Sequence, residues 1–217
     1  LDMENIVKTA YLGNATPATS FLQETHPAYH KAKNVYTLDL AKAKSLFADT
    51  GLKSIRLLCT DHAWVKKATP IIKSNLEAAG LTVDFTEKKS ADVYTTIDAD
   101  PNAFDAVIAP GDPSVFGADA DLALRWWYGA DTWTDKRMHW KGQDSYDQMQ
   151  TLLDKAITRT GNAQQQTWND VFDLASEVVP MYPLFHRKST TGYDSGPLTD
   201  FKPIALTGLS FLGTATK

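Results

Sequence analysis

The stretch SIRLLCTDHAWVKKATPIIKSNLEAAGLTVDFT, which spans residues 54–86, decides the fold class of this chain. It opens with a short apolar run over 54–60 and ends with alternating apolar and polar residues over 81–86, and both patterns are typical of strands. Between them lies an apolar stripe at helical spacing, which ends at Gly80 and consists of Val65, Ala68, Ile72, Leu76 and Ala79. Strand, helix and strand in this order form a right-handed unit with parallel strands, so the stretch predicts an α/β protein.

Pro70 lies inside this predicted helix. Because a proline lacks the N–H that a helix interior needs, it either starts the helix after a Thr69 cap or bends it. The apolar stripe lies on the same face in both cases.

A turn with a predicted ligand-facing position follows the next strand. This third apolar strand is expected over residues 104–109, and the run PGDP at 110–113 can only be traversed as a turn. Ligands of open α/β sheets collect at the carboxyl ends of the strands. We therefore expect a ligand to be faced by Ala109, Pro110, Gly111 and Asp112.

The rest of the chain predicts helices and short strands around this unit, which together give a mixed sheet with flanking helices. Helices are expected over residues 2–11, 37–50, 91–98, 119–128, 146–157 and 168–179, and strands over 181–188 and 190–194. The helix over 37–50 would be capped by Thr37 and stopped by Gly51. Its apolar stripe would consist of Leu40, Ala43, Leu46 and Phe47. Residues 14–35 show no period, so an irregular surface arm is expected there.

The composition excludes several classes of function. The 217 residues carry 22 basic and 26 acidic side chains, a formal charge of −4, and no basic run that could neutralise a phosphate backbone, so no nucleic acid is expected as a partner. No apolar stretch approaches the roughly 20 residues that a membrane helix needs. The single cysteine, Cys59, excludes an internal disulfide and a multi-cysteine zinc site.

Catalytic candidates are few, because no dinucleotide fingerprint, phosphate loop, nucleophile elbow or paired-histidine zinc helix occurs. Cys59 could be a nucleophile beside His62 or His186, but its apolar strand favours a buried structural thiol. His26 and His30 have a metal-like spacing of four, yet further ligands are too few to favour a metal site.

Two acidic pairs, Asp98 with Asp100 and Asp119 with Asp121, resemble those that hold divalent ions in some transferases. The second pair comes directly before a helical stripe, where carboxylates accept hydrogen bonds from free N–H groups, so capping is favoured for it. A small α/β enzyme that uses an Asp-x-Asp pair or Cys59 stays open as an alternative function.

Five large aromatic rings lie within fifteen residues: Trp126, Trp127, Tyr128, Trp133 and Trp140. They exceed what one helix face can bury, and neighbours such as Trp126 and Trp127 point about 100° apart on a helix. Flat rings beside polar groups also line clefts for sugars and peptides. We expect at least one of the four tryptophans to contact a ligand while the others pack into the core.

Ordered motifs along nearly the whole chain resemble one family. They are AYLGNATPA at 10–18, a helix that ends at Thr50 and Gly51, a helix end from Leu76 to Gly80, Phe104 with Asp105, the run GDP at 111–113, and VPMYPLFH at 179–186. In this order they resemble the C-terminal lobe of the family 5 extracellular solute-binding proteins, the peptide and nickel binders of ABC importers.

The resemblance implies a domain organisation. Residues 1–217 would form a single C-terminal lobe, one half of a two-lobed periplasmic-binding-protein-like fold, with ligand enclosed between the lobes. Within it, 1–35 would be a first helix and irregular arm, 36–195 the α/β body, and 196–217 a tail that returns toward the other lobe. Leu1 is not an initiator Met and no signal segment precedes the first helix, so we expect a piece of a longer protein.

The resemblance also implies a function without catalysis. The lobe would bind an oligopeptide or an oligosaccharide for the membrane subunits of an ABC transporter, as a monomer with no cofactor and no metal. The full protein would lie outside the cytoplasm, either lipid-anchored at the cell surface or in the periplasm.

One position departs from the family pattern. In peptide-binding members, an acidic residue just after the third strand pairs with the amino group of the ligand, whereas the matching Ala109 has no charge. Asp112 is an acidic residue that could replace it. Together with the tryptophan-rich loop, this departure keeps an oligosaccharide or another neutral ligand open beside a peptide.

Overall fold

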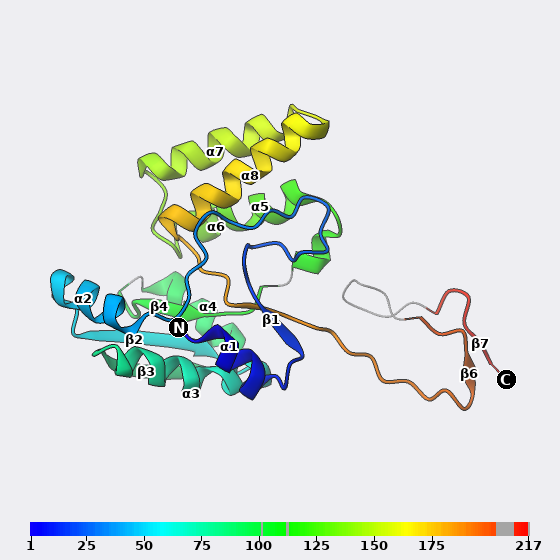
Figure 1. The fold of residues 1–217 in the computed structure, drawn as a ribbon, viewed down its shortest axis with the longest axis horizontal. Helices are drawn as coiled ribbons and strands as arrows, with labels where there is room; N and C mark the ends of the chain where they lie inside the picture. The colour runs from blue at the N-terminus through cyan, green and yellow to red at the C-terminus, as the bar shows by residue number, and fades with distance from the viewer. Residues whose placement is uncertain (101, 112, 203–210, 217) are drawn as a thin grey trace.

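The computed structural model describes residues 1–100, 102–111, 113–202 and 211–216. Its elements are, in chain order, α1 (Met3–Asn5), the π-helical turn η1 (Ile6–Ala10), β1 (Ala15–Pro17), α2 (Leu40–Thr50), β2 (Ser54–Thr60), α3 (Ala63–Ala78), β3 (Thr82–Lys88), α4 (Ser90–Ala99), β4 (Ala106–Ile108), the 3-10 helix η2 (Pro113–Phe116), α5 (Ala120–Tyr128), α6 (Asp131–Thr134), α7 (Asp144–Ile157), α8 (Gly161–Val178), β5 (Phe185–Arg187), β6 (Leu198–Thr199) and β7 (Ala215–Thr216). Figure 1 shows a layer that contains the sheet and α2–α4 below a layer of helices α5–α8.

The α/β class and the predicted strand–helix–strand unit are confirmed. A parallel sheet has the strand order β3-β2-β4, and the antiparallel pairs β1-β5 and β6-β7 lie outside it. Side chains on a strand alternate between its two faces. In β2, Leu57 and Cys59 accordingly pack in the cluster that α3 covers, whereas Leu58 packs on the other face against Val93 and Ile97 of α4.

The third strand is shorter than expected. β4 spans Ala106–Ile108 rather than 104–109. Just before it, Asp105 is joined to Arg56 of β2 by its backbone N–H, which donates to the Arg56 carbonyl at 3.0 Å, and by its side chain. Its Oδ2 accepts the Arg56 N–H at 2.7 Å, and its Oδ1 accepts a guanidinium N–H of Arg56 at 2.7 Å.

α3 passes through Pro70 and does not begin there, so of the two sequence interpretations the one with a start after Thr69 is wrong. The hydroxyl of Thr69 donates to the Val65 carbonyl at 2.9 Å inside the helix. Val65, Ala68 and Ile72 are buried, as the stripe predicts.

α2 differs from its prediction in two ways. Its cap is Asp39, whose carboxylate accepts the Lys42 N–H at 2.9 Å, rather than Thr37. No residue of the expected stripe is fully buried, and Leu46 is exposed. Gly51 does end the helix in a left-handed conformation with a φ of 71°, as predicted.

The helical layer holds the largest cluster of buried side chains. α5, α7 and α8 contribute Leu124, Tyr128, Met149, Leu153, Val171 and Phe172 to it. α8 begins at Gly161, earlier than expected. Among the helices in the described part of the chain, none is both long and apolar enough to cross a membrane.

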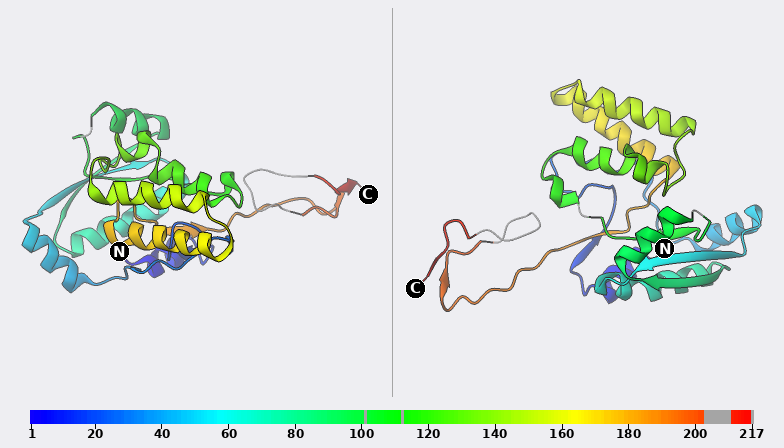
Figure 2. Two further views of the ribbon diagram at one scale, coloured as in Figure 1. Left: turned by 90° about the horizontal axis from the view of Figure 1, so that it is seen from above. Right: turned by 180° about the vertical axis from the view of Figure 1, so that it is seen from behind.

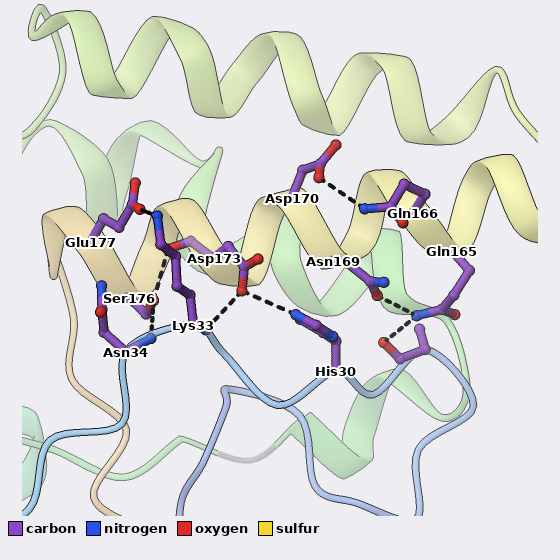
Figure 3. Close-up of polar contacts among 11 residues, drawn as sticks. His30, Lys33, Asn34, Gln165, Gln166, Asn169, Asp170, Asp173, Ser176 and Glu177 are labelled. Carbon is purple, nitrogen blue, oxygen red and sulfur yellow. Dashed lines mark hydrogen bonds and ion pairs between the residues drawn. The ribbon is translucent and has the colours of Figure 1, made fainter.

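The irregular arm that follows β1 is fixed to α8 by polar contacts, which Figure 3 shows. The carboxylate of Asp173 accepts the backbone N–H of Lys33 at 2.8 Å and contacts Nε2 of His30 at 3.0 Å. The backbone N–H of Asn34 donates to the Ser176 hydroxyl at 3.1 Å. The arm is therefore irregular in backbone but held in place by side chains.

The C-terminal part forms less strand than expected. Of residues 181–188, only Phe185–Arg187 form a strand. The predicted strand over 190–194 is wrong, and no strand in the described part of the chain pairs with it. Figures 1 and 2 show that the chain after β5 leads away from the body and ends in the small β6-β7 pair. Tyr193 and Phe201 contact each other there, with ring centroids 4.8 Å apart.

Candidate functional site

The carboxyl ends of the three parallel strands form one edge of the sheet. The register pairs Cys59 of β2 with Ile108 of β4 and Thr60 with Lys88 of β3, so the segments that follow leave the sheet side by side. These segments are the β2–α3 junction at 61–62 and the turn at 109–111. This edge is where an open parallel sheet places a ligand.

The turn rests on a tryptophan of the helical layer. A Cβ at Gly111 would lie 3.4 Å from Cζ2 of Trp127, so the ring covers the backbone of the turn. The Trp127 Nε1 is buried and donates to no acceptor among the described residues. Two parts of the predicted site, the turn and one tryptophan, are therefore in contact, whereas Asp112 lies outside the described residues.

The four predicted tryptophans divide into an exposed and a buried group. Trp126 is 53% exposed, whereas Trp127, Trp133 and Trp140 are 6%, 8% and 4% exposed. The rings of Trp127 and Trp133 have centroids 4.3 Å apart, and Nε1 of Trp140 donates to the Ser145 hydroxyl at 2.9 Å. The predicted packing of most of these rings into the core is confirmed, and contact between any of them and a ligand stays a prediction.

A second aromatic group, which the sequence did not predict, lies at the sheet edge. Trp64, in the first turn of α3, lies under the guanidinium of Arg187, whose Cζ is 4.6 Å from the ring centroid. Phe185 packs between Tyr11, at 4.7 Å, and Trp64, at 6.2 Å between centroids. The Tyr11 hydroxyl donates to the Trp64 carbonyl. These residues come from three distant segments, so no local pattern could have indicated the group.

Electrostatics at this edge follow from burial. Burial raises the pKa of Tyr11 to about 12, and the positive charge of Arg187 opposes that rise. His62 packs edge-on against Trp64 with centroids 6.2 Å apart.

Cys59 is buried in the sheet, as predicted. Burial raises the pKa of its thiol, and the Thr69 hydroxyl donates to its Sγ at 4.0 Å. Of its two candidate partners, His62 contacts Trp64, and His186 contacts the Ser20 carbonyl at 3.1 Å through Nε2. Among the described residues, no hydrogen bond joins Cys59 to either histidine.

The metal-like candidates have other partners. His30 contacts Asp173, while Nδ1 of His26 accepts the Ala28 N–H at 3.1 Å. Within residues 1–100, 102–111, 113–202 and 211–216, no three His, Cys, Asp or Glu side chains are grouped as metal ligands.

Both acidic pairs are used within the fold. Asp119 caps α5 by accepting the Leu122 N–H at 3.0 Å, which confirms the predicted capping, and Asp121 accepts from Nε of Arg125 at 3.1 Å. Asp98 is held by Arg137 through Nε at 2.8 Å and Nη2 at 2.9 Å, and Asp100 accepts the Asn102 N–H at 2.9 Å.

A small hollow between the arm and the end of α8 has a cavity volume of about 40 Å³ and is partly open to solvent. Its walls include Phe21, Tyr36, Phe172 and Tyr182. Tyr182 closes one side by donating its hydroxyl proton to the Tyr36 carbonyl at 3.0 Å. This hollow is lined mainly by apolar groups and lies beneath the arm rather than at the sheet edge.

A match to a sequence model shows the family of this chain. The sequence model of the bacterial extracellular solute-binding proteins, family 5 (middle region), matches residues 1–148. This chain belongs to that family. The comparison with curated proteins found no match.

Solved structures of solute-binding proteins share the fold. A dipeptide-binding protein from a Pseudoalteromonas species, in complex with Met-Leu, is 19% identical with a TM-score of 0.78, and the match covers 100% of this chain and 43% of that chain. NikA from Staphylococcus aureus, in complex with Ni(L-His)2, is 19% identical with a TM-score of 0.74, and the match covers 93% and 43%. AgaA from A. tumefaciens, in complex with agropinic acid, is 23% identical with a TM-score of 0.68, and the match covers 86% and 38%.

This chain therefore spans about two fifths of the length of these solved proteins, 43%, 43% and 38% respectively. The family and these solved neighbours are binding proteins.

Proposed function

We propose that this chain is one lobe of a two-lobed solute-binding protein that serves an ABC importer, and that the solute binds against the carboxyl edge of the sheet. The family match over residues 1–148, which includes the β2–α3 junction and the 109–112 turn, carries this proposal. A second lobe would supply the opposite wall, because ligand sites bury most of a ligand's surface. In this proposal the lobe is not an enzyme and needs no cofactor.

The proposed contacts are the turn, Ala109, Pro110, Gly111 and Asp112, together with the exposed Trp126. Trp127, Trp133 and Trp140 would support them from below, since Trp127 already lies against Gly111. We propose a peptide or an oligosaccharide-like solute. The neighbours hold solutes as different as Met-Leu, Ni(L-His)2 and agropinic acid, so the fold itself sets few limits on the ligand.

The proposed organisation follows the same division as the sequence analysis: a first helix and arm over 1–35, the body over 36–195, and the tail over 196–217 reaching the other lobe. The extended course of the chain after β5 supports this role for the tail (Figure 2). We further propose that the whole protein acts as a monomer outside the cytoplasm, lipid-anchored or periplasmic, with the membrane subunits of a transporter as partners.

Native mass spectrometry of the intact protein, purified from its own host, tests the proposal. We expect a co-purified small solute whose mass identifies it as a peptide, a sugar or a metal complex. Loss of that solute after Trp126→Ala, with folding unchanged, would place it at this edge. An intact protein that retains no solute, and whose stability no peptide or oligosaccharide raises, would contradict the function.

A further inference from the structure

The five arginines of this chain differ in what their guanidinium groups hold. Arg56 holds Asp105, Arg125 holds Asp121 and Asp154, and Arg137 holds Asp98. Arg159 donates to the Thr167 hydroxyl at 3.1 Å. Arg137 also lies over the rings of Tyr94 and Trp133, whereas the guanidinium of Arg187 has the ring of Trp64 and no carboxylate or hydroxyl as its partner among the described residues.

The Trp64 ring holds the Arg187 guanidinium in place without occupying the N–H donors of the guanidinium. A cation over an aromatic face is attracted by the ring, and the planar guanidinium keeps its N–H donors free at its edge. Trp64 is itself fixed, since Phe185 and His62 pack against its ring and Tyr11 bonds to its carbonyl. Arg187 is therefore an exposed cation with a preset position.

The position of Arg187 coincides with the edge where a solute is expected. Trp64 lies in the first turn of α3, directly after the carboxyl end of β2, and the turn at 109–111 leaves the neighbouring strand. The partial positive charge at the amino end of α3 adds to the attraction for an anion. Asp61, before α3, is the acidic residue of this junction, and Lys188 follows Arg187 in the chain.

We infer that Arg187, held on the Trp64 ring, binds a carboxylate group of the solute at the carboxyl end of β2. A carboxylate matches the paired N–H donors of a guanidinium edge, with two parallel hydrogen bonds. The site thus selects solutes that carry an acidic group, such as a peptide with a free C-terminus or an acidic sugar. The assignment of the carboxylate to a solute rests on the proposed function. The existence of the anion site does not depend on that function.

The anion site is tested on this chain by NMR with acetate as the probe. The Nε–H resonance of Arg187, assigned by its loss in Arg187→Lys, should shift and saturate as acetate replaces chloride at constant ionic strength. The matched control is Arg56, whose resonance should stay in place because Asp105 already occupies its guanidinium. Trp64→Leu should weaken acetate binding about tenfold, since the ring no longer presets the cation. An Arg187 shift that rises linearly with acetate concentration would contradict the anion site. Equal shifts of the Arg187 and Arg56 resonances would contradict it as well.

The source of the carboxylate is tested on the intact protein by native mass spectrometry. Wild type should retain a solute with an acidic group, and Arg187→Gln should lose it while Arg159→Gln keeps it. A retained solute without an acidic group, or one that Arg187→Gln holds as well as wild type, overturns the inference while the proposed function stands. Saturable acetate binding by a protein that binds no solute would support the anion site and contradict the proposed function.

Discussion

The tryptophans of the helical layer and the tryptophan at the start of α3 occupy different environments. Trp127, Trp133 and Trp140 are buried against one another and against neighbouring rings, whereas Trp64 lies half-buried at the sheet edge under an exposed arginine. The larger group contributes mainly packing energy, and the smaller group leaves donors free for another molecule. In this chain, the dense run of aromatic residues therefore serves mainly to fill the core.

The largest expected effect is on stability in the helical layer. Trp127→Ala and Trp133→Ala should each lower the free energy of unfolding by about 3–5 kcal/mol, because each leaves a cavity in the core. Denaturant unfolding measures this loss. Trp126→Ala is the matched control, since its ring is exposed, and it should change stability by less than about 0.5 kcal/mol. Equal losses of unfolding free energy in Trp126→Ala and Trp127→Ala would contradict the difference between exposed and buried tryptophans.

A smaller effect is expected where the two layers meet. Arg137 lies over the rings of Tyr94 and Trp133, at 4.7 and 4.5 Å from their centroids, and holds Asp98 of α4. Arg137→Gln should lower the free energy of unfolding by about 1–3 kcal/mol at pH 7.

That effect should depend on pH in one direction. The hydrogen bonds from Arg137 lower the pKa of Asp98, so the ion pair stabilises the fold at pH values above the ordinary carboxyl range. Its contribution is lost as pH falls through the lowered pKa of Asp98, and the difference between wild type and Arg137→Gln should shrink below about pH 4. A difference that stays constant from pH 7 to pH 3 would show that packing, rather than the ion pair, joins the layers.

A substitution at the sheet edge should lower the free energy of unfolding less than a substitution in the helical layer. Trp64→Leu should lower the free energy of unfolding by about 1–2 kcal/mol, less than the core tryptophans, because the ring is only partly buried. Thermal and denaturant unfolding of this chain provide the measurement. A loss as large as that of Trp127→Ala would place Trp64 in the core and remove the contrast.

The smallest effect is expected at Arg187. Its guanidinium is exposed and forms no ion pair within the described part of the chain, so Arg187→Gln should change stability by less than about 0.5 kcal/mol. Arg137→Gln is the comparison, and denaturant midpoints measured side by side report the difference. If Arg187→Gln were the more destabilising of the two, Arg187 would have a structural role.

How far the sequence predicted this fold depends on how far apart in the chain the interacting residues lie. The strand–helix–strand unit followed from local periodicity, and the burial of Cys59 and the capping by Asp119 followed from their immediate neighbours. The exposed face of α2 and the missing strand over 190–194 did not, because neighbours distant in the chain decide whether an apolar stripe is covered or a strand is paired. The contact between Trp64 and Arg187 could not be predicted for the same reason, because the two residues lie far apart in the chain, in α3 and β5.

Hydrogen exchange of the intact protein, with its co-purified solute bound and after the solute is removed, tests most directly whether the carboxyl edge of the sheet meets the solute. Bound solute should slow exchange at residues 61–64 and 109–111, at the ends of β2 and β4, and leave the amides of α7 and the outer turns of α8 unchanged. Protection confined to α7 and α8, with none at the ends of β2 and β4, would contradict a binding site at this edge.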